Sequence, residues 1–112
     1  MREVKISEIV DRTGLESVTA WEDRDIPAVY VSDMSSDIIT AADSGCLLLT
    51  LQTHKSLIAA ANVVDAAMVV FAHGKRPADD VLELAKRVSI PLFCTADDTW
   101  TYAVKLFELG MR

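Results

Sequence analysis

The apolar residues of this chain gather in short unbroken runs, separated by polar turns and by stretches with helical periodicity. The runs 46–51 and 68–71 show almost no alternation of apolar and polar positions, which is typical of strands covered on both faces. An alanine-rich stretch at 55–64 lies between them, and about a dozen residues are enough for a helical crossover between parallel strands. This central segment therefore predicts a right-handed strand-helix-strand unit.

The flanking segments repeat this pattern on both sides of the central unit. They predict a strand at 28–31, a helix that is capped by Ser35 or Ser36 and reaches about Asp43, a helix at 78–89, a strand at 91–94, and a last helix after 95–99 that ends at Gly110. The predicted fold class is α/β: a single layered domain with a mainly parallel central sheet flanked by helices.

Residues 1–20 predict a short strand-helix prelude to this sheet. The expected elements are a strand at 4–6, a helix that is capped by Ser7 and ends at Gly14, and a second short strand at 15–19. Serine is a favoured N-cap, and glycine is favoured just past a helix end. The segment 21–27 is charged and ends in proline, so we expect a connection there.

Three predicted strands are followed by small polar residues and then by a helix start. These strand exits, at 32–36, 50–54 and 95–99, should converge on one edge of the sheet together with 73–76. In open parallel sheets, ligands bind at the edge formed by the carboxyl ends of the strands. The candidate ligand-binding residues are Ser32, Asp33, Ser35, Gln52, Thr53, His54, His73, Gly74, Lys75 and Arg76.

Each of these turns also has a purely structural explanation. Hydroxyl and carboxylate side chains before a helix satisfy its free N–H groups, and a solvated surface loop would account for Lys75 and Arg76. Alternatively, the two cations could hold a phosphate or carboxylate together with nearby backbone amides. His54 and His73 are of a type that titrates near neutral pH, but their spacing matches no metal-binding motif.

Length and charge narrow the function classes. The 112 residues form one domain by size. With 17 acidic and 11 basic residues the formal charge is −6, so an extended phosphate backbone would be repelled and nucleic-acid binding is not expected. The longest apolar runs fall far short of the ~20 residues that span a bilayer, and residues 1–5 carry no apolar signal region. We therefore expect a cytoplasmic protein without a membrane partner.

Cofactor and redox motifs are missing from the chain. The two cysteines, Cys46 and Cys94, lie in or beside apolar strands and belong to no CxxC pair, so we expect reduced core residues. Neither GxxxxGK[ST] nor GxGxxG occurs, and there are only four glycines. Such loops need glycines because backbone N–H groups must approach the phosphates closely. No cofactor and no metal is predicted.

The whole chain resembles the DRTGG domain. The resemblance rests on Val-Lys-Ile-Ser-Glu-Ile at 4–9, on 29–37, on Leu-Gln-Thr-His at 51–54, on Gly-Lys-Arg-Pro at 74–77 and on the closing segment 95–109. This module is also found in phosphotransacetylases and CBS-containing pyrophosphatases, and it is similar to the N-terminal domain of HPr kinase/phosphorylase. The resemblance implies an α/β domain that tends to dimerise and serves as a regulatory or ligand-sensing partner, without an established activity of its own.

The letters of the family label need care. Asp-Arg-Thr-Gly occurs at 11–14, on the predicted end of the first helix, and Asp23-Arg24 precedes the strand at 28–31 as an equal or better match. Neither is followed by a pair of glycines. We therefore transfer no function through this motif.

Three functional hypotheses follow. The leading one is a non-catalytic regulatory module that forms a homodimer, because an interface would bury part of the 51% apolar content, and that binds a small anionic metabolite or nucleotide. The second is an enzyme of phosphoryl or acyl transfer in which His54 or His73 acts beside Lys75 and Arg76. The third is a protein-interaction subunit of a larger metabolic or redox complex, with the turn residues serving only as caps.

Overall fold

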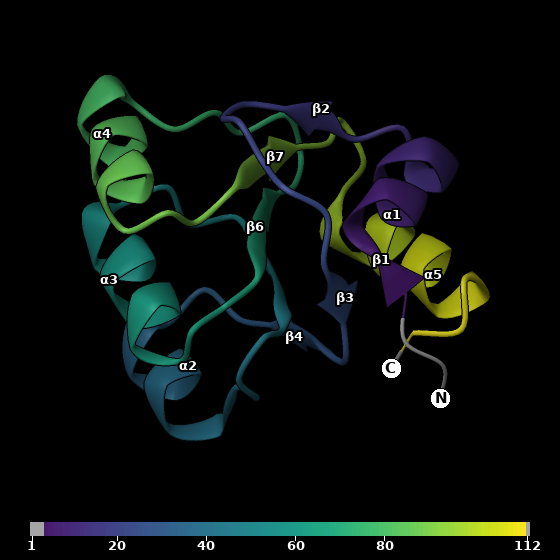
Figure 1. The fold of residues 1–112 in the computed structure, drawn as a ribbon, viewed down its shortest axis with the longest axis horizontal. Helices are drawn as coiled ribbons and strands as arrows, with labels where there is room; N and C mark the ends of the chain where they lie inside the picture. Colours follow the sequence, from purple (N-terminus) through teal and green to yellow (C-terminus); the bar gives the residue numbers. More distant parts are fainter. Residues whose placement is uncertain (1–3, 112) are drawn as a thin grey trace.

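Five strands form the central sheet of the computed structural model, which describes residues 4–111. They are β2 (Glu16–Ser17), β4 (Val29–Val31), β5 (Leu47–Thr50), β6 (Met68–Phe71) and β7 (Leu92–Cys94). Their order is β2-β7-β6-β5-β4 (Figure 1). The last four run parallel, and β2 pairs with β7 in the antiparallel sense. The predicted α/β fold with a mainly parallel sheet is confirmed.

Five helices of the described chain cover this sheet in two layers. They are α1 (Ile6–Thr13), α2 (Ser35–Ala41), α3 (Lys55–Val63), α4 (Asp79–Arg87) and α5 (Thr99–Glu108). Figure 1 shows α2, α3 and α4 on one face of the sheet and α1 and α5 on the other. None of these helices has the length and apolar character that a membrane crossing requires.

Both faces of the central strands are buried, which explains the unbroken apolar runs. All four residues of β5 and of β6 are buried. In β5, Leu47 and Leu49 belong to the core beneath α1 and α5, whereas Leu48 belongs to the core beneath α2, α3 and α4. Successive side chains point to opposite faces of a strand, so a sheet with helices on both sides needs apolar residues at every position.

A second, two-stranded sheet lies beside α1. It pairs β1 (Val4–Lys5) with β3 (Asp25–Ile26) in the antiparallel sense, with Val4 opposite Ile26. The prediction of a plain connection at 21–27 was therefore wrong at its end. A strand of two residues, followed by Pro27, leaves no periodic signal, and only its partner and the burial of Ile26 reveal it.

The predicted serine caps were also wrong. Helix α1 begins at Ile6, and its N-cap Lys5 makes no side-chain bond. Ser7 instead donates from its backbone N–H to Asp23 Oδ1 at 2.9 Å and from its hydroxyl to Asp23 Oδ2 at 2.7 Å. These bonds hold the pKa of Asp23 below its usual range. Ser35 is likewise the first residue of α2, with Met34 as an N-cap that makes no side-chain bond.

The end of α1 confirms that Asp-Arg-Thr-Gly at 11–14 closes a helix. Gly14 adopts a left-handed conformation with φ of 69°, and its N–H donates to the carbonyl of Val10. The buried Thr13 hydroxyl donates to the carbonyl of Ile9 and lies 2.9 Å from the Tyr102 hydroxyl of α5. In this chain the threonine joins α1 to α5, and the glycine closes the end of α1.

Candidate functional site

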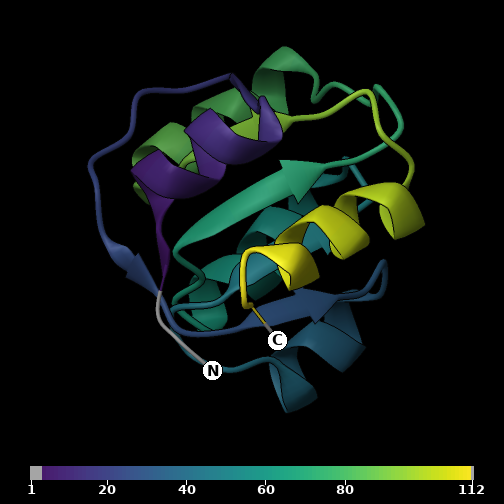
Figure 2. The ribbon, with the colours of Figure 1, turned by 90° about the vertical axis from the view of Figure 1, so that its right-hand side faces the viewer.

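The polar strand exits lie on one edge of the sheet. In the observed register Thr50 is opposite Phe71, which is opposite Cys94, so these strands end at one level. The exits after β5 and β6 are joined directly, because the N–H of Ala72 donates to the carbonyl of Thr50 at 3.0 Å. In Figure 2 the arrows of β4 and β6 point to the same side. The structure therefore places the candidate residues along one border of the sheet.

Hydroxyl side chains fold three of these exits in the same way. The side-chain oxygens of Ser32, Thr50 and Thr95 each accept a hydrogen bond from the backbone N–H two residues further on, at distances of 3.2, 3.0 and 3.2 Å. Hydroxyls that bind the following backbone stabilise a turn. The repeated polar pattern of the sequence thus corresponds to a repeated turn, with helix capping only at Asp98, whose carboxylate accepts from the N–H of Thr101 at 2.7 Å.

Asp33 ties the exits of β4 and β5 together. Its Oδ1 accepts a hydrogen bond from the Thr50 hydroxyl at 2.9 Å and another from the backbone N–H of Leu51 at 2.8 Å. The Thr50 side chain is almost fully buried. These bonds connect two parallel strands at their carboxyl ends, so this candidate ligand residue also has a structural role.

Replacing Asp33 by alanine should lower the free energy of unfolding by about 1–2 kcal/mol, because a buried hydroxyl and a backbone N–H lose their acceptor. Asp33→Asn should lower it less, since the amide oxygen still accepts. Urea denaturation measures both values. Asp43→Ala, at an exposed residue outside these bonds, is the matched control, and an equal loss in this control would contradict the role assigned to Asp33.

The two histidines lie exposed on different turns. His54 is the N-cap residue of α3 but makes no capping bond with its side chain. His73 has φ of 60°, and its N–H donates to the carbonyl of Asp97 at 2.6 Å. Its imidazole lies near Asp98, whose pKa is held low mainly by the bond from Thr101 and to a smaller extent by His73. The two imidazoles thus stand beside different helix starts.

The remaining uncharged candidates belong to the same turns. Ser35 is half-buried at the first position of α2, and Gln52 and Thr53 are half-buried before α3. Gly74 has φ of 68°, and its N–H donates to the carbonyl of Thr95 at 2.9 Å. A non-glycine residue with this conformation is uncommon, so Gly74 shapes the turn after β6.

Most cations at this edge are already engaged. Arg76 Nη2 lies 2.7 Å from Glu16 Oε2 on β2, and this bond lowers the pKa of Glu16 and raises that of Arg76. Lys105 Nζ lies 2.6 Å from Asp97 Oδ2, an oxygen that accepts no regular hydrogen bond within residues 4–111, so the contact is an ion pair. The Arg76 guanidinium is therefore already paired with a carboxylate rather than held open for an anion.

The thiols are core groups, as predicted. Cys46 and Cys94 are both buried and free. Burial raises the pKa of Cys46 to about 11 and also raises that of Cys94. Since the thiolate is the reactive form, neither sulfur is suited to nucleophilic chemistry at neutral pH.

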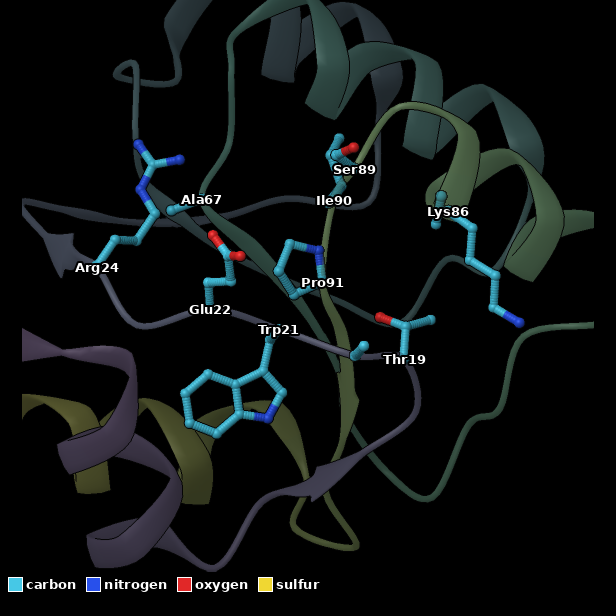
Figure 3. Close-up of a pocket in the computed structure, with 11 residues that line it drawn as sticks. Thr19, Trp21, Glu22, Arg24, Ala67, Lys86, Ser89, Ile90 and Pro91 are labelled. Carbon is cyan, nitrogen blue, oxygen red and sulfur yellow. The ribbon is translucent and has the colours of Figure 1, made fainter.

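A cavity of about 550 Å³ lies at the opposite, amino edge of the sheet (Figure 3). It lies between the connection that leads into β3 and the turn that joins α4 to β7. The lining residues are Thr19, Ala20, Trp21, Glu22, Arg24, Ala67, Ala85, Lys86, Ser89, Ile90 and Pro91. Ala67 directly precedes β6, and Pro91 directly precedes β7, so the floor of this cavity is formed where two parallel strands begin.

A second cavity of about 560 Å³ lies beside the edge strand β4, and its lining is apolar. The lining residues are Val29, Val31, Trp100, Ala103, Val104, Leu106, Phe107 and Met111. Trp100 and Phe107 are among the most exposed large apolar side chains of the described chain, at 77% and 58%. Such a surface suits an apolar partner better than a charged metabolite.

None of the ten predicted site residues lines either of these two cavities. The prediction followed the carboxyl-edge rule, which does not consider loops that close over the amino edge. A signal was present in the segment 21–24, Trp-Glu-Asp-Arg. A connection between two strands does not require an aromatic ring and charges of both signs within four residues, so this composition indicates a further role. Trp21 packs on Phe93, with ring centroids 6.0 Å apart, so its indole ring also covers the core.

Comparisons with known proteins agree with this architecture. Curated protein sequences gave no match. The chain is similar to the crystal structure of the CBS and DRTGG domains of the regulatory region of Clostridium perfringens pyrophosphatase, complexed with the activator diadenosine tetraphosphate. The TM-score is 0.76 at 20% identity, over 90% of this chain and 45% of that chain. This likeness shows a shared fold, and the chain spans less than half the length of that structure.

The family follows from the sequence itself. The family model described as the DRTGG domain matches residues 8–109. The match includes the parallel strands, the turns at both edges of the sheet and the whole of α5. It therefore spans nearly all of the chain, and this protein belongs to the DRTGG domain family.

Proposed function

We propose that this protein is a non-catalytic regulatory module that senses a small anionic metabolite or nucleotide. The observation that carries the proposal is the shared fold, over 90% of the chain, with a regulatory region that was crystallised with a nucleotide activator. Membership of the DRTGG family supports a regulatory role. The exposed and separated histidines and the buried thiols offer no assembled catalytic group, which also favours binding over turnover.

A thermal-shift screen tests this proposal. The panel contains AMP, ADP, ATP, diadenosine tetraphosphate and small phosphorylated metabolites, with adenosine and added salt as controls for the base and for ionic strength. A ligand at about 100 times its Kd stabilises the folded state by about 2.7 kcal/mol, which raises Tm by roughly 10 °C or more in a domain of this size. No rise in Tm with any compound would contradict ligand sensing and favour a protein-interaction subunit.

Chromatography of the same mixtures tests the non-catalytic part. The nucleotides should be recovered unchanged after hours with the protein. Steady conversion that is lost in the variant His54→Ala or His73→Ala would instead establish the enzymatic hypothesis, since a rim histidine would then be needed for turnover.

A homodimer is the second part of the proposal. Within residues 4–111, β4 is an edge strand that pairs with β5 alone, and the apolar cavity formed by β4 and α5 adjoins it. A two-fold axis beside β4 would pair this edge with its copy and cover both apolar surfaces at once. Sedimentation at micromolar concentration should give twice the mass of the single chain.

A further inference from the structure

The polar groups of the amino-edge cavity are less engaged than those of the carboxyl edge. At the carboxyl edge Lys55, Arg76 and Lys105 each lie within 4.0 Å of a carboxylate, and of the cations described there Lys75 alone does not. Arg24 and Lys86 line the cavity, and within residues 4–111 neither forms an ion pair with a carboxylate. In a chain with a formal charge of −6, a cation without a carboxylate partner in the described residues makes each end of the cavity attractive to an anion.

Arg24 is held in place by its surroundings. The carbonyl of Arg24 accepts a hydrogen bond from the N–H of Ile6 at 3.1 Å. Its guanidinium lies over Gly45, where a Cβ atom would stand 3.4 Å from Nη2. Gly45 has φ of 78°, which favours glycine. The guanidinium thus rests against Gly45 beside the start of β5, and the five N–H donors of arginine suit a phosphate or a carboxylate.

The middle of the cavity has a different character from its two ends. Figure 3 shows Arg24 at one end and Lys86 at the other, with Glu22 and Pro91 between them. Ala67, Ile90 and Pro91 supply apolar surface, while the Glu22 carboxylate accepts hydrogen bonds and repels a bare anion. A ligand that fits must have a flat apolar part with N–H or O–H donors, which would lie in the middle of the cavity. It must also have an anionic group, which would lie at an end of the cavity beside a cation. The volume of about 550 Å³ is in the range of small-molecule sites.

From this arrangement we propose that the amino-edge cavity is the ligand site and that it takes a nucleoside-phosphate type of molecule. Arg24 binds its phosphate groups at one end of the cavity, Glu22 accepts from the hydroxyl or amino groups of the nucleoside, and the apolar floor packs against the base. Lys86, at the opposite end, adds only electrostatic attraction. This inference rests on the proposed sensing function and specifies where that function is located.

Calorimetric titration of the full chain with AMP and ATP tests the site. The double variant Arg24→Ala/Lys86→Ala should raise the Kd of both nucleotides at least tenfold. The matched control is Lys75→Ala/Arg76→Ala, which removes the same charge at the carboxyl edge and should change each Kd less than threefold. All four positions are exposed, and thermal unfolding without ligand verifies that each variant is folded.

The variant Glu22→Ala distinguishes recognition of the nucleoside from simple attraction of a negative charge. Removing an acidic residue lowers the repulsion of any anion, so the binding of inorganic pyrophosphate should be unchanged or tighter. The binding of AMP should become at least threefold weaker, because the nucleoside loses its acceptor. Amide chemical shifts should move at 20–22 and 89–90 on addition of AMP, and stay in place at 53–54 and 74–75.

The outcomes separate this inference from the proposed function. If a nucleotide raises Tm but its affinity falls only in the carboxyl-edge variant, or its chemical shifts cluster at that edge, the cavity is refuted and ligand sensing stands. If neither AMP nor ATP binds while another small anion raises Tm, the assigned ligand class is wrong. If no compound of the panel raises Tm, both proposals fall.

Discussion

Replacing either Leu48 or Leu49 by alanine should lower the free energy of unfolding by about 2–5 kcal/mol, a large part of the ~5–15 kcal/mol that holds a small domain together. Both side chains are fully buried, but they belong to different cores, Leu48 beneath α2, α3 and α4 and Leu49 beneath α1 and α5. Each substitution leaves a void in a separate layer. Urea denaturation measures both losses.

The fold is tested by whether Leu48→Ala and Leu49→Ala lower the free energy of unfolding by similar amounts. A strand with one solvated face would lose stability strongly at only one of two consecutive positions. The control is Leu51→Ala, because Leu51 follows the same strand with its side chain 39% exposed, and it should cost less than about 1 kcal/mol. A small loss at either Leu48 or Leu49 would show that one helical layer does not cover β5.

The second large effect should come from Trp100→Glu, which we expect to raise the Kd of the proposed homodimer by about 30-fold or more. Large aromatic side chains at the centre of an interface commonly contribute 2 kcal/mol or more, and a carboxylate there would also lose its solvation. Sedimentation over a concentration series measures the change. The stability of the monomer should hardly differ, because Trp100 is 77% exposed.

Val63→Glu is the matched control for this experiment. Val63 is 65% exposed at the end of α3, in the helical layer on the other face of the sheet from Trp100. It introduces the same charge at an exposed apolar position outside the proposed interface. Dissociation by both variants to the same extent would attribute the effect to net charge, and a dimer that resists Trp100→Glu would place the interface elsewhere.

The elements of the central unit were predictable because their signals are local. The crossover from β5 through α3 to β6 was predicted with its bounds nearly correct, since two buried apolar runs and a helical stretch between them permit few alternatives. The charge order of α4, with Asp79 and Asp80 in the first turn and Lys86 and Arg87 in the last, matches the helix dipole and agrees with the structure.

The predicted site was harder to judge for a physical reason. The polar residues at the carboxyl edge were interpreted from the sequence as helix caps or ligand donors, whereas most of them stabilise turns. The sequence does not show which of them already have hydrogen-bond partners. Asp33 binds Thr50 and Leu51, and Arg76 binds Glu16 from a strand at the far edge of the sheet. Ligand binding by these candidates stays a prediction. The cavity residues come from segments whose distance along the chain gave no sign of proximity.

The sequence by itself determined the layered α/β class, the parallel direction of the central strands and the absence of cofactor motifs, because apolar periodicity and loop chemistry operate within a few residues. Only the tertiary structure decided that Asp23 supports α1, that Arg24 and Lys86 line opposite ends of one cavity, and that an apolar cavity lies beside β4. Those features depend on contacts between distant segments, and such contacts exist only after the whole core has packed.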